Sequence, residues 1–310
     1  MGPNQRFKIN FSYFWKGFSI DSLLEMFPFL AVDYELAVTN DPEIIFYSCF
    51  DSKNPVAQLP GGAYCWEMPK IEQSNAVTVF LTGENVEPNM ENCDFAITHS
   101  ALVDHPNHLQ MPMWAYPGYS PELLIQHKPI DWECIADQKD RFCNFVYSHD
   151  VEFRNDIFRQ FDQFKRVDAA GQCMNNMGGW RVKKGYDQKL AFLQRYKFTL
   201  AIENTIWPGY QTEKLMHPML VHSIPIYVGD PLAGTMFNPS SYVDFAEFRT
   251  IREMREYVTD MDNDRNMYLE ALSSQRLRGN VLPQSIRASA VQLFMQRIFS
   301  TATERRCRSG

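Results

Sequence analysis

Two polar residues, Glu203 and Asn204, end an apolar run that is typical of a buried strand. In α/β sheets, ligands bind at the carboxyl edge of the strands, so these two side chains mark a candidate site. A loop then leads to Tyr210, Glu213 and Lys214 at the start of a predicted helix, whose N-terminus offers free N–H groups and partial positive charge. A diphosphate suits these features, because Lys214 adds a full charge and Glu213 can accept hydrogen bonds from ribose hydroxyls.

The alternative for Glu213 and Lys214 is an ordinary first helical turn whose charges are solvated. For an isolated Glu-Lys pair, that interpretation would be the better one. The Glu203–Asn204 pair at the end of the preceding strand favours the ligand site instead.

The elements around this segment alternate between strands and helices. Apolar runs predict strands over residues 199–202 and 224–228, and the pattern between them predicts a helix over about 212–222, which makes a βαβ unit of ordinary length. Before it, a strand is predicted over 142–148 and a helix over 151–161.

The first third of the chain has a similar alternation. We expect a helix over residues 21–30, capped by Ser19 or Asp21. Continuous apolar runs bounded by turn residues are typical of strands in a parallel sheet that is covered on both faces. Such runs predict strands over residues 8–14, 43–47, 77–81 and 95–98.

The 310 residues exceed what one core usually supports, so we predict an α/β fold of two Rossmann-like domains that face a cleft. Residues 105–140 are rich in proline and are interpreted as the connection between the domains. An amphipathic helix is predicted over residues 285–303. The predicted parts are two domains over residues 1–130 and 131–284, followed by a C-terminal helix within residues 285–310.

The composition narrows the class of protein. A net charge of -7 disfavours a nucleic-acid binder. Aromatic residues make up 14% of the chain, which suits large cores, with sugar-stacking clefts as the second use. The C-terminal arginines either contact an acidic membrane surface or, as the simpler interpretation, are solvated in a frayed end. They are Arg297, Arg305, Arg306 and Arg308.

The seven cysteines are irregularly spaced and form no CxxC motif, which disfavours a zinc ribbon or a thioredoxin site and favours a reducing compartment. No uncharged stretch approaches about 18 apolar residues, so we expect a soluble protein. The expected location is the cytoplasm or the inner face of a membrane, with a shortened Golgi-type enzyme as the alternative.

Several common catalytic motifs do not occur. The sequence has no GxGxxG, GxxxxGK[ST], HExxH or GxSxG motif, which disfavours a dinucleotide site, a P-loop, a zinc protease and an α/β-hydrolase. Asp260 and Asp262 form an Asp-x-Asp pair, but their charged helical context predicts a solvated face. We therefore expect protein cations, rather than a metal ion held by aspartates, to hold the diphosphate.

Three runs of the chain resemble the donor motif of the α-1,3/4-fucosyltransferases, the inverting GDP-fucose enzymes of glycosyltransferase family 10. They are YKFTLAIEN from Tyr196, GYQTEKL from Gly209 and SIPIYVGDP from Ser223. RFCNFVYS from Arg141, followed by Arg154, resembles the family's strand and helix that carry a donor-binding arginine. FLTGENVEPN from Phe80 resembles its loop that carries the catalytic base. The resemblance covers about residues 76 to 245 and implies the GT-B arrangement. It also implies that residues 1–130 bind the acceptor, that residues 131–284 bind the GDP-fucose donor, and that the C-terminal helix packs back on the first domain.

The resemblance also implies the roles of single residues. Glu84 matches the general base, and the preceding Gly83 lets the backbone turn Glu84 inward, which favours it over Glu87. Arg154 matches the arginine that holds the diphosphate. Lys214 matches the second phosphate cation, Glu213 the ribose contact, and Tyr210 and Asn204 further donor contacts. Glu203 is assigned to a place near the fucose or to support of the strand end, and both options stay open.

The implied reaction transfers L-fucose from GDP-β-L-fucose, with inversion, to a GlcNAc-containing glycan, most simply through an α-1,3 linkage. No metal is required, although Mn²⁺ is a possible stimulant. The alternatives are a transferase for another GDP-sugar and an inactive protein that binds glycans or nucleotide sugars. The sequence departs from the family pattern at His217-Pro218, which is expected to interrupt the helix, at Trp207-Pro208 in the donor loop, and in having no C-terminal heptad repeats.

Overall fold

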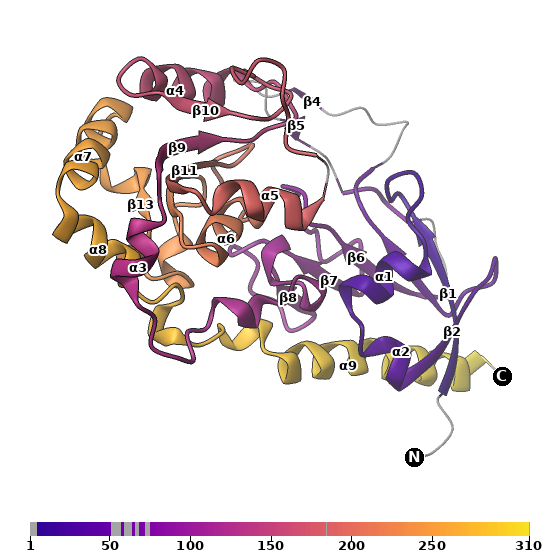
Figure 1. Cartoon of the computed structure of the whole chain (residues 1–310). Coiled ribbons are helices and arrows are strands. Elements are labelled where there is room, and N and C mark those ends of the chain that lie inside the picture. Colours follow the sequence, from indigo (N-terminus) through magenta and orange to yellow (C-terminus); the bar gives the residue numbers. More distant parts are fainter. Residues whose placement is uncertain are drawn as a thin grey trace.

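Two parallel β-sheets organise the chain (Figure 1). The computed structural model describes residues 5–50, 57–58, 64–65, 68–71, 75–183 and 185–309. The first sheet has the strand order β2-β1-β3-β6-β7-β8, and the second has the order β10-β9-β11-β12-β13. A short antiparallel pair is formed by β4 (Ala57–Gln58) and β5 (Tyr64–Cys65). The predicted α/β class with parallel sheets is confirmed.

The first sheet comes from the N-terminal third of the chain. Its strands are β1 (Gln5–Ser12), β2 (Tyr34–Val38), β3 (Ile44–Tyr47), β6 (Val77–Leu81), β7 (Phe95–Thr98) and β8 (His108–Gln110). Helix α1 (Ile20–Met26) follows Ser19, whose N–H donates to Ser22 Oγ at 3.3 Å, and α2 (Leu30–Asp33) is one short turn. Alternate residues of a strand point to opposite faces. Phe46 accordingly joins the main core, whereas the adjacent Tyr47 packs in a smaller cluster on the other face.

The second sheet follows the same principle. Its strands are β9 (Arg141–Phe145), β10 (Val167–Ala169), β11 (Tyr196–Ile202), β12 (Ile224–Val228) and β13 (Val243–Asp244). Leu200 and Ile202 face a cluster that contains α4 (Glu152–Asp162), α7 (Ile251–Asn263) and α8 (Arg265–Ser273). Between them, Ala201 faces the other side, where α6 (Glu213–Leu220) packs. Both faces of this sheet are therefore covered, as the apolar run predicted.

One apolar core continues from the first half into the second. Leu215, Met216 and Met219 of α6 belong to the same cluster as Phe7, Phe46 and Trp114 of the first half. The segment 105–140, predicted as a connection, contributes to this core, because Trp114, Ala115 and Tyr116 are buried. It contains β8, the 3-10 helices η1 (Met113–Ala115), η2 (Pro117–Tyr119) and η3 (Pro121–Leu124), and α3 (Trp132–Asp137). The segment leads from β8 of the first sheet to β9 of the second, as a connection does, and its apolar residues also fill the space between the halves.

Helix α9 (Ala288–Ser309) runs beneath the first half, and its C-terminal part lies near the start of β1, where Gln5 Nε2 donates to Thr303 Oγ1 at 3.0 Å (Figure 1). Phe299 stacks on Tyr34, with the ring centroids 4.0 Å apart, and meets Phe7 edge-on at 4.9 Å. For three of the four C-terminal arginines the prediction of a solvated, frayed end was wrong, whereas the Arg308 side chain is 81% exposed. Arg305 pairs with Asp94, Arg306 with Glu43 at 3.0 Å, and Arg297 donates to Pro106 O at 2.9 Å.

Other details of the predictions change. Helix α6 continues through Pro218 to Leu220, so the proline does not interrupt it. Asp262 does not lie on a solvated face, because its side chain is buried and pairs with Lys165 and Lys197. The six cysteines whose side chains the structure describes are free. None of the described helices has the length and apolar character needed to cross a bilayer. The domain boundaries at residues 130 and 284 stay predictions.

The packing of α9 is testable by unfolding. Phe299→Ala removes a ring that is only 2% exposed and should lower the free energy of unfolding by about 3–5 kcal/mol, since a cavity is left against Phe7 and Tyr34. Urea titration followed by circular dichroism measures this loss. Leu293→Ala is the matched control on the same helix, because Leu293 is 61% exposed and its loss should cost no more than about 0.5 kcal/mol. Equal effects of the two substitutions would contradict the assigned packing.

Candidate functional site

A cavity of about 350 Å³ opens at the carboxyl edge of the second sheet. It lies where the strand order reverses, because the chain leaves β9 toward β10 on one side and β11 lies on the other. Such switch points are where open α/β sheets bind ligands. The lining side chains follow the ends of β9, β10 and β11 or come from α4, α5 (Tyr186–Leu193) and α6. They include Tyr147, Ser148, His149, Arg154, Gln172, Arg181, Lys183, Lys189, Asn204, Glu213 and Lys214.

The lining is strongly cationic, although the whole chain carries a net charge of -7. Five arginine or lysine side chains face the cavity, namely Arg154, Arg181, Lys183, Lys189 and Lys214, and Glu213 is the one carboxylate among its described lining residues. A partly enclosed site screens charges less than bulk water does, so these cations strengthen one another's attraction for an anion.

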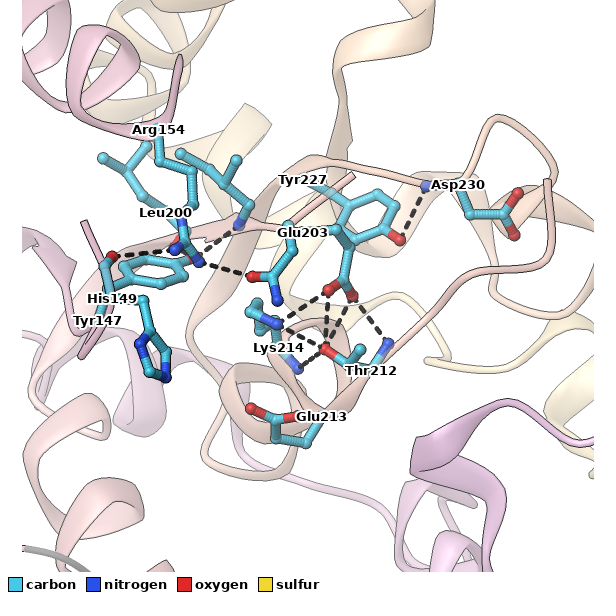
Figure 2. Close-up of polar contacts among 12 residues, drawn as sticks. Tyr147, His149, Arg154, Leu200, Glu203, Thr212, Glu213, Lys214, Tyr227 and Asp230 are labelled. Atoms are coloured by element: carbon cyan, nitrogen blue, oxygen red, sulfur yellow. Dashed lines mark hydrogen bonds and ion pairs between the residues drawn. The ribbon is translucent and has the colours of Figure 1, made fainter. Parts of the chain in front are cut away.

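Arg154 is the most firmly held of these cations (Figure 2). One terminal nitrogen donates to Asn204 Oδ1 at 2.9 Å and the other donates to His149 O at 3.0 Å. The guanidinium lies 4.5 Å from the centre of the Tyr147 ring, and its Nε is buried without a partner among the described residues. A buried donor that lacks a partner has an unmet demand for an acceptor. Arg154 and Asn204 are therefore brought together as predicted, in a form suited to an oxyanion.

Tyr147 is fixed by β11 and in turn fixes Arg154. Its hydroxyl donates to Leu200 O at 2.9 Å and accepts from Ile202 N–H at 2.6 Å (Figure 2). These backbone groups lie in the C-terminal part of β11, so the ring cannot move without breaking buried hydrogen bonds. Tyr147 was not predicted as a site residue, because its role depends on this cross-strand contact.

Glu203 is fully buried directly behind the cavity (Figure 2). Its carboxylate accepts from the N–H of Thr212 at 2.8 Å, from the Thr212 hydroxyl at 2.8 Å and 3.0 Å, and from Lys214 Nζ at 3.0 Å. Thr212 is also the N-cap of α6, since its hydroxyl accepts from Lys214 N–H at 3.4 Å. Of the two options left open for Glu203, this geometry favours support of the strand end, because its oxygens are occupied by the protein.

The charges of α6 adjust to one another. Burial alone would lower the pKa of Lys214, but the carboxylates of Glu203 and Glu213 raise it above its ordinary value. Burial opposes ionisation of Glu213, yet Lys214 and Lys189 lower its pKa to about 2. The Lys189 ammonium lies 3.6 Å from Glu213, and burial lowers its pKa. Glu213 and Lys214 are therefore ionised at neutral pH, as a charged binding site requires.

Tyr210 is buried at the junction of the two halves and is not among the residues that line this cavity. Its ring meets His99 edge-on, with the centroids 5.3 Å apart. The preceding Gly209 has φ +82 and approaches His99 so closely that a Cβ would lie 2.4 Å from the carbonyl oxygen. Only glycine fits this approach, so the loop between β11 and α6, which we call the donor loop, contacts the first half closely.

Glu87 belongs to the same junction. Its carboxylate accepts from Trp207 Nε1 at 2.7 Å and from the hydroxyl of Ser100. Trp207, which departs from the family pattern, therefore joins the donor loop to the first half. These bonds occupy both oxygens of Glu87, which makes it a poor candidate for proton transfer.

Glu84 follows the end of β6, and the hydrogen bonding of its carboxylate differs from that of Glu87. Its N–H donates to Thr82 Oγ1 at 3.1 Å, and no described residue bonds its carboxylate. Burial raises its pKa. The charge of Lys214 lowers this pKa and the charges of Glu213 and Glu203 raise it, so the carboxylate lies within electrostatic range of the start of α6. Gly83 is not among the residues with positive φ. The predicted reason for this glycine was wrong, because what it permits is close approach to Met113, whose Cγ would lie 3.2 Å from a Cβ.

Several lining residues were not predicted. Arg181 and Lys183 come from a loop, and Lys189 comes from a helix that the sequence analysis did not identify. A usable signal existed, since residues 181–184 contain three basic side chains in a chain that is otherwise acidic. Lys189 had no such signal, because its charge matters only through the contact of α5 with α6.

Two family models match the sequence. The model described as "Glycosyltransferase family 10 (fucosyltransferase) C-term" matches residues 136–278, and "Alpha-(1,3)-fucosyltransferase FucT N-terminal domain" matches residues 63–116. Alpha-(1,3)-fucosyltransferase FucT of Helicobacter pylori is 30% identical over 232 residues, which are 65% of this chain and 48% of that protein. The chain thus spans about half the length of this relative.

Solved structures extend the similarity to nearly the whole chain. A crystal structure of an alpha1,3-fucosyltransferase with GDP matches with a TM-score of 0.77 and 24% identity, covering 96% of this chain and 92% of the other. The structure described as the same kind of enzyme with GDP-fucose gives a TM-score of 0.74 and 23% identity, covering 96% and 92%. These matches confirm the GT-B arrangement.

The support that Glu203 gives to Lys214 is testable without any ligand. Glu203→Gln leaves a buried ammonium without its counter-charge and should lower the free energy of unfolding by about 3–5 kcal/mol. Adding Lys214→Met to this variant removes the unpaired ammonium and should restore part of the loss. The control is Asp140→Asn, which breaks the exposed Arg195–Asp140 pair and should leave the urea midpoint unchanged. A loss in Glu203→Gln no larger than in the control would refute the assignment.

Proposed function

Since this chain belongs to glycosyltransferase family 10, the fucosyltransferases, we propose that it transfers L-fucose from GDP-fucose to a hydroxyl group of a glycan. The observation that carries the proposal is the cationic cavity at the switch point of the second sheet, with the Glu84 carboxylate of the first half in electrostatic range of Lys214, which lines that cavity. The similar structures in complex with GDP and GDP-fucose support this donor.

The cavity would hold the diphosphate of the donor. Arg154 offers a fixed planar fork with an unpartnered Nε, and Lys214 of α6 and Lys189 of α5 add charge. Glu213 is ionised and accepts hydrogen bonds from the ribose hydroxyls. As the bond between C1 of fucose and the phosphate oxygen breaks, negative charge grows on the departing GDP, and these cations stabilise it. Tyr210 would support the donor loop from behind, since it is buried against His99.

Glu84 is the proposed general base. The acceptor oxygen attacks C1 of fucose while Glu84 takes its proton, and the C1–phosphate bond breaks on the opposite face, so a β-linked donor gives an α-fucoside. Burial raises the pKa of Glu84, which strengthens its carboxylate as a base. None of these steps requires a metal ion, and the effect of Mn²⁺ is a matter for assay with and without a chelator.

The acceptor we propose is a GlcNAc-containing glycan, with α-1,3 linkage. Membrane contact through the C-terminus is not part of the proposal, because Arg297, Arg305 and Arg306 bond to residues of the first half. A cytoplasmic or inner-membrane location stays a prediction.

The choice of donor is tested by assaying different nucleotide sugars separately at the same concentration. GDP-fucose should be hydrolysed or transferred with saturation, and GDP-mannose or UDP-galactose at the same concentration should give at least about tenfold less product. Liquid chromatography of released GDP or UDP measures each reaction. Saturation with another GDP-sugar instead would assign the chain to that donor. Binding of GDP without turnover of any donor, in the presence of a glycan panel, would identify a binding protein.

The role of Glu84 predicts a specific pH profile. Turnover should rise with pH as Glu84 loses its proton, with a midpoint above 4.5 because burial raises this pKa. Glu84→Gln should lower kcat by about 100-fold or more, remove the acid limb of the profile and leave the affinity for GDP within about twofold. The matched control is Glu87→Gln, which should keep kcat within a few-fold. A larger loss in Glu87→Gln than in Glu84→Gln would exchange their roles.

A further inference from the structure

A groove with a volume of about 600 Å³ opens on the first half, away from the cationic cavity. It lies between the end of β1, helix α1 and the 3-10 helices η2 and η3. We call it the aromatic groove and define it by Trp15, Glu25, Met26, Pro28, Gly118 and Tyr119. None of these six residues was predicted from the sequence as a site residue.

The aromatic groove lies at the switch point of the first sheet. The chain leaves β1 toward β2 on one side, and β3 lies on the other, and Trp15 follows closely after the end of β1. Both sheets therefore present a hollow at the equivalent place, the carboxyl edge where the strand order reverses. In the second sheet that place is the cationic cavity.

The groove is also next to the proposed reaction centre. Helix η2 contacts α1, and η3, which follows it directly, contacts α6, whose first residue is Glu213. Tyr119 is close enough to Glu213 for that carboxylate to raise the pKa of its hydroxyl, after the larger effect of burial. Tyr116, just before η2, is similarly within reach of the Glu84 charge. A ligand in the groove would thus lie on the side of the first half that contacts α6, the helix that begins with Glu213.

The two aromatic walls are held in place but are not covered. Trp15 is 43% exposed, although its ring meets Phe18 and Phe50 edge-on, with centroids 4.9 Å and 5.7 Å away. Tyr119 is 38% exposed and is carried by a turn pressed against α1. A Cβ at Gly118 would lie 1.9 Å from Glu25 O, so glycine is required for this close approach. Rigid aromatic rings that stay exposed in a hollow are typical of binding surfaces.

The chemistry of the lining selects one class of ligand. Among the described residues that line the groove there is no lysine or arginine, so this lining offers no cation to an anion. The exposed Glu25 carboxylate bonds to no described residue, and Ser22 and Ser120 add hydroxyl groups. Aromatic faces pack against the C–H faces of a sugar ring, and a carboxylate accepts hydrogen bonds from its hydroxyls. We propose that the aromatic groove binds the acceptor saccharide, a neutral glycan of two or more sugar units, with Trp15 and Tyr119 as stacking platforms and Glu25 as the hydroxyl acceptor; this rests on the proposed function.

Kinetics test the groove against the donor site. A panel of N-acetyllactosamine, lactose and N,N′-diacetylchitobiose is assayed with GDP-fucose, and the best substrate serves as the probe. Trp15→Ala and Tyr119→Ala should each raise the KM for that saccharide at least about tenfold, while calorimetry shows GDP affinity within about twofold. The matched control is Tyr257→Ala, which removes an equally exposed ring (40%) from α7 and should not change this KM. Unchanged KM in both groove variants overturns the proposal.

A binding measurement separates failure of the groove from failure of the proposed function. The chain is labelled with ¹⁵N-tryptophan, and the Trp15 indole signal is assigned by its loss in Trp15→Phe. Titration with each panel saccharide should shift this signal more than the other indole signals, whether or not any transfer occurs. If GDP does not bind, the proposed donor site is wrong while this titration still tests the groove. No Trp15 shift with any panel saccharide at about 20 mM, far above ordinary KM values, overturns the groove.

Discussion

The buried ion pair of Glu203 and Lys214 is the interaction on which the candidate site depends. Glu203 ends β11 and Lys214 begins α6, so the pair closes the loop between them and, with Thr212, caps the helix. A buried carboxylate without such partners would be too costly to keep ionised. Because this network fixes both ends of the loop, Asn204 beside Arg154 and Glu213 beside Lys189 are also placed. The charges that face the cavity are thus positioned by a charge that never reaches it.

The same helix joins the two halves of the protein. One side of α6 carries Glu213 and Lys214 at the cavity, while Leu215, Met216 and Met219 pack in the core shared with the first half. Hydrogen bonds at the junction add direction to this apolar contact, including Trp114 Nε1 to Gln211 Oε1 at 2.8 Å and Trp207 Nε1 to Glu87 Oε1 at 2.7 Å. Since apolar packing is non-directional, such bonds determine how the two sheets are oriented relative to each other. The distance from Glu84 to the cavity follows from this junction.

Much of the architecture was predictable because continuous apolar runs bounded by turn residues specify buried parallel strands. The bounds of β6, β7 and β12 agree with their apolar runs, and the long donor motif located the carboxyl edge at Glu203. What was not predictable depends on contacts between distant segments. Lys189 reaches the cavity only through the packing of α5 on α6, and Asp262 is buried only because Lys165 and Lys197 converge on it. Likewise, the proline-rich segment 105–140 does connect the two sheets, but its composition does not reveal that Trp114 and Tyr116 are buried between them.

On the proposed function, the charges near Glu84 affect how readily this carboxylate accepts a proton. Among the charges near Glu84, Lys214 lowers its pKa, whereas Glu213 and Glu203 raise it. A diphosphate bound in the cavity would offset the Lys214 charge, which removes the one cation that favours the ionised carboxylate and adds negative charge nearby. The pKa of Glu84 must then rise, so the carboxylate becomes a stronger base when the donor is in place. Burial behind a closed cleft increases this effect, because the interaction of two charges grows as the local dielectric falls. The cationic cavity therefore acts on both reactants: it stabilises the departing phosphate directly, and through its neutralisation it prepares the base on the opposite sheet.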